Sequence, residues 1–115
     1  MLIRMTMKYP MTPDGRYFVV DGRLWRRSNP MLEKSERDRL VQELMLARRA
    51  IHDATTTAQR TLARKQVDKI KRALGERGPV WWTDGEPDYN CRMVANTPYA
   101  SWYAQLQSAK AVNSN

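Results

Sequence analysis

Two β-forming runs joined by an Asp-Gly pair constrain this chain most, because such a pair is the strongest short-range signal for a β-hairpin. The runs cover residues 16–20 and 23–27, and the turn is Asp21-Gly22. Both residues of a two-residue turn must adopt positive φ angles, which favours Asp-Gly there. An isolated hairpin is marginally stable in water, so we expect this one to pack on the rest of the chain. The turn predicts four cross-strand pairs, which are Val20 with Arg23, Val19 with Leu24, Phe18 with Trp25, and Tyr17 with Arg26.

Two amphipathic helices are predicted after the hairpin. The first covers about 36–53 and begins at a capping box of Ser35 and Asp38. The second covers about 57–74, begins at a capping box of Thr56 and Gln59, and ends at Gly75. Their apolar rows are Leu40, Leu44, Ala47 and Ile51, widened by Val41 and Met45, and Ala63, Val67, Ile70 and Leu74. The two rows are spaced symmetrically about residue 57, which lies beside the break between the helices at 55–57. The helices are therefore expected to pack antiparallel.

The last third of the chain is rich in turn residues and ends in a predicted helix over about 98–109. Thr97 is its expected N-cap and Pro98 its first helical residue. Its expected apolar face consists of Tyr99, Trp102, Tyr103 and Leu106. The chain is therefore predicted to be α+β, with an N-terminal β-hairpin packed on an antiparallel helical hairpin, then an aromatic-rich loop and a short C-terminal helix.

We expect a single domain over residues 16–109. Residues 1–15 form a tail or an extra strand, since apolar and polar residues alternate there, and residues 110–115 are expected to fray. The alternating apolar residues are Ile3, Met5, Met7 and Tyr9.

The composition is that of a folded protein without a cofactor. The chain has 115 residues, 42% of them hydrophobic, which argues against disorder and suits one domain. A single Cys excludes an internal disulfide and, with a single His, excludes a Cys/His zinc cluster. No apolar run is long enough to span a membrane or to form a signal peptide. We therefore expect a cytoplasmic protein with reduced cysteine and no metal.

The charge predicts an anionic partner. Lys and Arg number 20 against 12 Asp and Glu, a net charge of +8, and the whole excess lies in the first 75 residues. Cations that neutralise phosphates give salt-dependent binding. No recognition motif is visible, so we expect a non-enzymatic protein that contacts DNA or RNA largely non-specifically. The expected contacts are Arg16, Arg23, Arg26 and Arg27 of the hairpin and Lys65, Lys69 and Arg72 on one stripe of the second helix.

The aromatic residues lie apart from this charge in the sequence, with six of the ten in the last third. Single-strand-binding proteins interleave basic and aromatic side chains, and the linear order here does not. Trp81 and Trp82 suggest an alternative function. One indole is expected in the core, and the other, if exposed beside Arg77, would form the hot spot of a protein–protein adaptor.

Polar residues in the 76–103 segment suggest a third hypothesis, a small enzyme. They are Asp84, Asp88, Asn90 and Arg92. Asp84, Glu86, Asp88 and Asn90 place an acidic or amide group at every second position, which resembles the start of a calcium loop. Tyr89, however, stands where that loop needs glycine and Ala95 where it needs glutamate. We therefore predict Asp and Asn turns there. No nucleophile elbow or zinc-protease motif is present, so no residue is assigned a catalytic role.

Six segments together resemble a small, uncharacterised bacterial protein family. They read RYFVV at 16–20, LWR at 24–26, SNP at 28–30, GERGPVWW at 75–82, PDYN at 87–90 and NTPYA at 96–100. The resemblance covers about residues 16–103. It implies a bacterial cytosolic origin, and it implies no activity, ligand or catalytic residue.

Overall fold

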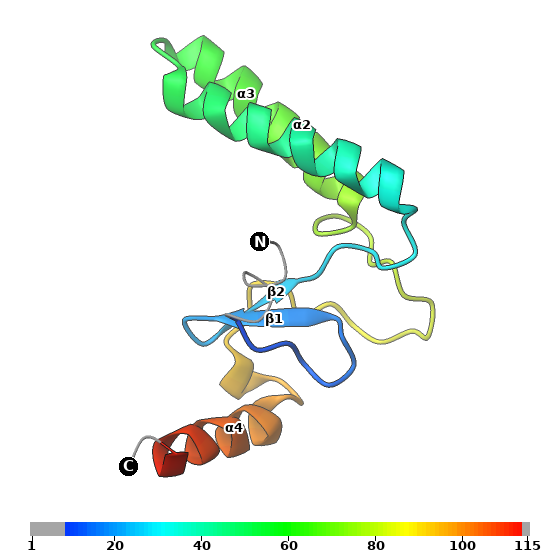
Figure 1. The fold of residues 1–115 in the computed structure, drawn as a ribbon, viewed down its shortest axis with the longest axis vertical. Coiled ribbons are helices and arrows are strands. Elements are labelled where there is room, and N and C mark those ends of the chain that lie inside the picture. The colour runs from blue at the N-terminus through cyan, green and yellow to red at the C-terminus, as the bar shows by residue number, and fades with distance from the viewer. Residues whose placement is uncertain (1–8, 114–115) are drawn as a thin grey trace. The chain divides into compact units, whose positions relative to one another are not determined.

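The computed structural model describes residues 9–113, with side chains up to residue 110. Its elements, shown in Figure 1, are β1 (Tyr17–Val20), β2 (Arg23–Arg26), α2 (Lys34–Asp53), α3 (Thr57–Leu74), the 3-10 helix η1 (Val94–Asn96) and α4 (Ala100–Asn113). The chain is thus α+β, as the sequence predicts. It divides into two compact units, which we describe separately. Residues 28–86 form the helical unit, and the other described residues form the sheet unit. A single domain over 16–109 stays a prediction.

The predicted hairpin register is confirmed at all four pairs of β1 and β2. Asp21 and Gly22 have φ angles of 52° and 77°, as the two-residue turn requires. Single antiparallel bridges extend this sheet on both sides, from Met11 to Phe18 and from Met93 to Arg23. Most of the extra strand considered for residues 1–15 lies outside the described residues.

One face of the hairpin forms the core of the sheet unit. Side chains alternate between the two faces of a strand, and the buried ones on this face are Tyr17, Val19, Leu24 and Arg26. The Tyr17 ring contacts Tyr99 edge-on, with ring centroids 5.6 Å apart. Val94 of η1 is also buried, and its N–H donates to the Gly22 carbonyl at 2.9 Å. The sheet unit is therefore built from segments about 70 residues apart in the sequence.

The helix bounds follow local capping chemistry. α3 has its predicted bounds, and the Thr56 hydroxyl accepts the Gln59 N–H at 3.1 Å. α2 begins at Lys34, two residues earlier than predicted, so the capping box of Ser35 and Asp38 is wrong. The Asp38 carboxylate instead pairs with Lys34 at 2.8 Å, which places Ser35 inside the first turn.

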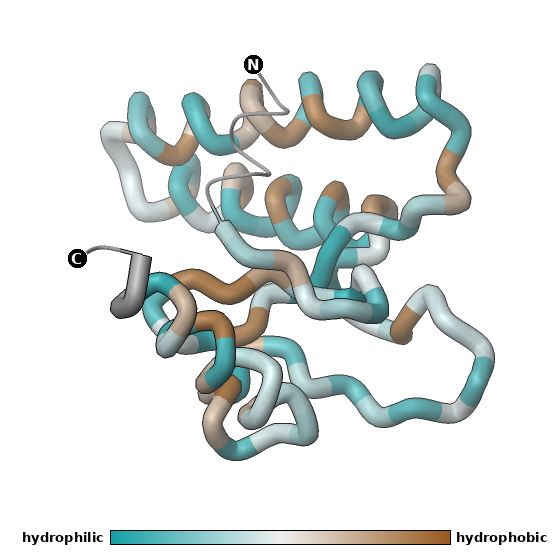
Figure 2. Tube along the Cα trace, turned by 60° about the horizontal axis from the view of Figure 1, so that its bottom comes forward, coloured by the Kyte–Doolittle hydropathy of each residue, from teal (hydrophilic) through white to brown (hydrophobic). Residues whose placement is uncertain are grey.

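The two helices pack along their predicted apolar rows, and Figure 2 shows hydrophobic residues recurring along both. The buried cluster consists of Leu40, Leu44, Val67, Ile70 and Leu74, with Ala47, Val41 and Ile51 partly buried against it. Met45, expected to widen this row, is 63% exposed. A helix turns by about 100° per residue, so Met45 points about 100° away from the buried Leu44 and lies outside the packed face.

α4 begins at Ala100, two residues later than predicted, because Pro98 and Tyr99 form a turn after η1, so the expectation that Pro98 is the first helical residue is wrong. The Thr97 hydroxyl donates to the Val94 carbonyl at 2.8 Å and accepts the Tyr99 N–H at 3.3 Å. The predicted face of Tyr99, Trp102, Tyr103 and Leu106 is half-buried, as expected. Among the described helices, none is long and apolar enough to cross a membrane.

Gly75 provides a test of the helix end. It ends α3 with φ at 89°, and a Cβ there would lie 3.1 Å from both Asn29 Cβ and Trp81 Cδ1. Gly85 has a similar φ of 84°, and a Cβ added there would have nothing within 4 Å. We expect Gly85→Ala to lower the free energy of unfolding by about 1 kcal/mol through backbone strain alone. Gly75→Ala should cost at least about 1 kcal/mol more, because the methyl group also overpacks.

Urea unfolding monitored by circular dichroism measures both changes. Equal losses in the two variants would show that Gly75 is required only for its backbone conformation.

Candidate nucleic-acid interface

The positive charge of the helical unit is concentrated on α3. This helix carries six cations and one carboxylate, Asp68. We call the cations the α3 basic face, and they are Arg60, Arg64, Lys65, Lys69, Lys71 and Arg72. Arg64, Lys65, Lys69 and Arg72 are exposed, whereas Arg60 and Lys71 flank the buried row of Ala63, Val67, Ile70 and Leu74 and are half-buried.

The carboxylate of α3 neutralises little of this charge. Asp68 bonds both Arg72, at 2.9 Å, and Arg77, at 3.2 Å. These hydrogen bonds hold the pKa of Asp68 below its usual value. Within the described residues, Arg64, Lys65 and Lys69 form no ion pair. The α3 basic face therefore keeps most of its positive charge at neutral pH.

The neighbouring helix is almost neutral by comparison. α2 carries five Lys and Arg against four Asp and Glu. Arg39 lies between Glu36 and Glu43, with contacts of 2.5 Å and 2.9 Å. Lys34 pairs with Asp38. The charge excess of the helical unit is therefore a property of one helix.

The three predicted contacts on α3 all lie on its exposed surface, but they have different surroundings. Lys65 is exposed, Lys69 borders a groove between the helices, and Arg72 is held by Asp68. The Arg72 side chain also packs against the loop after α3, because a Cβ added at Gly78 would lie 3.0 Å from Arg72 Nη1. Arg64, which the prediction did not select, is exposed as well, whereas Arg60 and Lys71 are half-buried and the Arg60 guanidinium donates to the Ala54 carbonyl at 3.5 Å.

The four hairpin arginines divide between the two faces of the sheet. Arg23 is exposed, and its guanidinium donates to the Cys91 carbonyl at 2.9 Å. Arg16 lies 3.9 Å from Asp14, with 15% of its side chain exposed, and Arg27 is half-buried. Arg26 points inward, and its side chain has no exposed surface. A polyanion cannot reach it, so we remove Arg26 from the candidate interface.

Arg26 is instead the centre of a polar cluster in the core of the sheet unit. Its guanidinium pairs with Asp88 at 2.9 Å, and its backbone N–H donates to the Asn90 side chain at 2.9 Å. The Tyr17 hydroxyl accepts the Tyr89 N–H at 2.8 Å and lies 3.5 Å from Asp88. Burial, reinforced by the Asp88 charge, raises the pKa of Tyr17 to about 12. A buried charge needs such a partner, which gives the cluster a structural role.

Three of the four polar residues of the enzyme hypothesis form structural contacts, and the fourth, Arg92, is exposed. Asp88 and Asn90 bond Arg26, and Asp84 accepts the Glu86 N–H at 3.1 Å in an Asp turn. Asp84 belongs to the helical unit, whereas Asp88, Asn90 and Arg92 belong to the sheet unit. In the described part of the chain, no cluster of His, Cys, Asp and Glu could hold a metal ion.

The tryptophans of the adaptor hypothesis pack on their own loop. Trp82 is 8% exposed, and its indole N–H donates to the Glu86 carbonyl at 2.7 Å. Trp81 is half-buried and contacts Trp82 edge-on, at 5.1 Å between ring centroids. Arg77 is bound to Asp68. Neither indole protrudes in the way that an interface hot spot would require.

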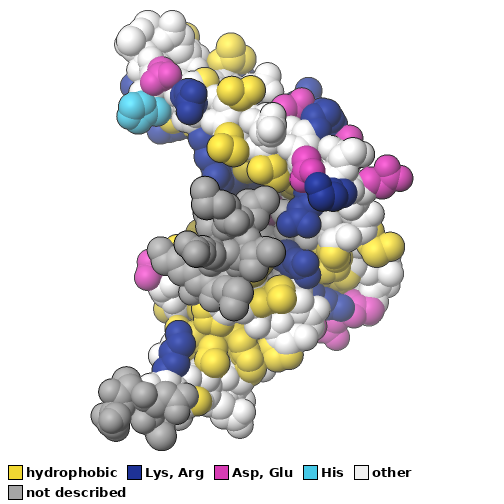
Figure 3. Space-filling model, in the orientation of Figure 1, with side chains coloured by type: hydrophobic (Ala, Val, Ile, Leu, Met, Phe, Trp, Pro, Cys, Tyr) yellow, Lys and Arg dark blue, Asp and Glu magenta, His cyan; other side chains and the backbone are white. Residues whose placement is uncertain are grey.

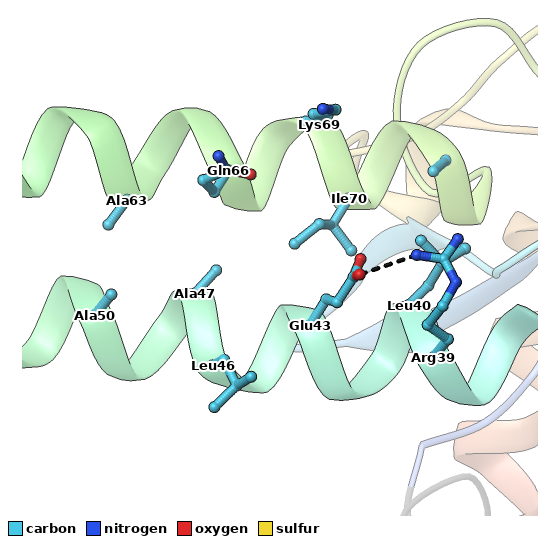
Figure 4. A pocket seen from close by; sticks show the side chains of 11 residues that line it. Arg39, Leu40, Glu43, Leu46, Ala47, Ala50, Ala63, Gln66, Lys69 and Ile70 are labelled. Atoms are coloured by element: carbon cyan, nitrogen blue, oxygen red, sulfur yellow. Dashed lines mark hydrogen bonds and ion pairs between the residues drawn. The ribbon is translucent and has the colours of Figure 1, made fainter.

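A shallow groove of about 600 Å³ runs between α2 and α3. Figure 4 shows its alanine-rich floor and the ion pair of Arg39 and Glu43 on one rim. Leu46 and Leu62 are about two-thirds exposed near it, and hydrophobic side chains are visible along the helical pair in Figure 3. The residues that line this groove include no Ser, Cys or His. It offers no nucleophile paired with a base, which covalent catalysis would require.

Comparison with known proteins gives no relative: no protein-family model, no curated protein and no solved structure matches the chain. The expected membership of a small bacterial family stays a prediction.

The hydroxyl of Tyr17 provides a test of the polar cluster. Because the folded state holds the pKa of Tyr17 at about 12, above the usual value of 10, the fold keeps this proton after an unfolded chain has lost it. The stability that this proton contributes is therefore fully present below pH 10 and is lost as the pH rises from 10 to 12. Tyr17→Phe should lower the free energy of unfolding at pH 7 by about 1–2 kcal/mol, since it leaves the Tyr89 N–H without its acceptor.

The same variant should lose less stability than the natural protein between pH 9 and pH 11.5. Urea unfolding at both pH values measures the difference. An equal alkaline loss in both proteins would mean that the Tyr17 proton does not stabilise the fold.

Proposed function

We propose that this protein is a non-enzymatic nucleic-acid-binding protein whose α3 basic face contacts the phosphate backbone largely without regard to base sequence. The observation that supports this function is the charge of α3. The helix carries six cations and a single carboxylate, and that carboxylate already pairs with Arg72 and Arg77. Protein cations that neutralise phosphates release the condensed counterions of the nucleic acid, which drives association.

The arrangement of the cations favours a linear polyanion. Residues 60–72 of α3 span about 18 Å at the helical rise of 1.5 Å per residue. The cations recur along this whole length, so a backbone lying beside the helix could meet several of them at once. A small anion would use only one or two. α2 has a much smaller charge excess, because its five Lys and Arg stand against four Asp and Glu, and two of the cations, Lys34 and Arg39, pair with carboxylates of the same helix.

Salt dependence tests the proposal directly. If about four to six phosphates are neutralised, log K should fall with log salt with a slope near −4 to −5 for duplex DNA and near −3 to −4 for single-stranded DNA. In the triple variant Arg64→Gln, Lys65→Gln, Lys69→Gln, the slope should become shallower by about 2 to 3, since each lost phosphate contact removes about one. Fluorescence anisotropy of a labelled oligonucleotide between 25 and 200 mM salt measures both.

A matched control separates local contact from total charge. Arg37→Gln, Arg49→Gln and Lys110→Gln also remove three positive charges, from exposed sites on α2 and α4. This variant should keep a slope near that of the natural protein. Absence of binding at low salt would refute the proposed function. Equal slopes for the two triple variants would show that the protein responds only to its net charge.

A further inference from the structure

The outer face of the hairpin combines aromatic and basic side chains. The Arg27 N–H donates to the Arg16 carbonyl at 2.8 Å, which extends the hairpin register by one pair beyond β1 and β2. Alternation along the strands then places three pairs opposite the buried face. They are Arg16 with Arg27, Phe18 with Trp25, and Val20 with Arg23.

This outer face is open to solvent at Trp25, whereas its partner Phe18 is half-buried. Trp25 is 43% exposed, whereas Trp82 is buried and Trp81 and Trp102 are half-buried. Met11 and Met93, which bridge to Phe18 and Arg23, are 44% and 38% exposed. Exposed apolar side chains that gather on one surface mark an interaction site more often than scattered ones do.

We propose that this outer face binds single-stranded nucleic acid, with bases stacked on Trp25 and Phe18 and phosphates held by Arg23 and Arg27. The proposal rests on the function assigned above and specifies the form of nucleic acid and a second contact surface. Aromatic platforms beside cations bind single strands because unpaired bases expose their ring faces. A duplex keeps its bases stacked on one another and offers such a platform nothing to cover.

Charge complementarity favours this partner over an apolar peptide. The outer face carries three arginines and no carboxylate among its cross-strand pairs. Arg23 and Arg27 lie on either side of Trp25 on the same strand face, so the indole has a cation about 7 Å away in both directions along the chain. Arg16 contributes less, because it is largely covered beside Asp14. An acidic peptide would satisfy the arginines without using the ring faces.

Substitution of Trp25 tests the proposal with oligothymidylate as the probe. Trp25→Ala should lower the affinity for a 15-nucleotide oligothymidylate by at least about fivefold, and Trp25→Phe should retain most of it. Neither variant should change the affinity for duplex DNA, and the salt slope should stay the same. Met31→Ala, which removes an exposed side chain from the helical unit, is the matched control and should leave every affinity unchanged.

A spectroscopic measurement keeps the test independent of stability. Oligothymidylate should quench the tryptophan fluorescence of the natural protein, and Trp25→Phe should abolish that quenching. Polyglutamate, a polyanion without bases, should cause none. The proposal for the outer face is overturned if the affinity of Trp25→Ala for oligothymidylate is within twofold of that of the natural protein. It is also overturned if the affinities of this variant for polyglutamate and for oligothymidylate fall to the same extent. In both cases salt-dependent duplex binding would leave the role of α3 intact, whereas no binding of any nucleic acid would refute both proposals.

Discussion

A guanidinium that has no contact with water must be neutralised, and in the sheet unit Asp88 does this for Arg26. The pair joins strand β2 to a loop 62 residues further along the chain. Around this pair, the Asn90 side chain accepts the Arg26 backbone N–H, and the Tyr17 hydroxyl accepts the Tyr89 N–H. Because strand side chains alternate, fixing Arg26 inward also fixes Trp25 and Arg27 outward. This ion pair, together with the buried Tyr17, Val19 and Leu24 on the same face, leaves the opposite face of the hairpin turned outward.

The two units present different kinds of side chain at their surfaces. The helical unit has six cations along α3 and a neighbouring helix with nearly equal numbers of cations and carboxylates. The sheet unit has an exposed indole with arginines on the same strand face. Phosphate contact gives affinity without base preference, whereas stacking distinguishes unpaired from paired bases. A protein with both could favour single strands without reading their sequence.

Local signals in the sequence were sufficient for the hairpin register and for α3. The Asp21-Gly22 turn determined four strand pairs, and Thr56 and Gly75 determined both ends of a helix, because each signal acts over only a few residues. The predicted start of α2 was wrong because the helix begins after Glu33, which makes no side-chain cap hydrogen bond, so no capping pattern marks the boundary. Asp38, expected to complete the capping box, pairs with Lys34 instead.

Residue roles that depend on distant partners could not be predicted in the same way. Arg26 was grouped with the phosphate contacts because nothing local distinguishes it from Arg27, and its partner Asp88 lies far along the sequence. The linear order also separates most aromatic residues from the cations, although strand alternation brings Phe18 and Trp25 together with arginines. The Phe18–Trp25 pair was predicted, and considering which face it occupies would have revealed this surface.

The crowding of like charges on α3 has a consequence for the free protein. Arg60 and Arg64, and Lys65 and Lys69, are spaced four residues apart, and each such pair repels by a few tenths of a kcal/mol. Dissolved ions weaken that repulsion, so added salt should stabilise the unbound helix while it weakens the attachment of a polyanion. A bound phosphate chain would relieve the same internal repulsion, and occupancy would then make the helical hairpin harder to melt.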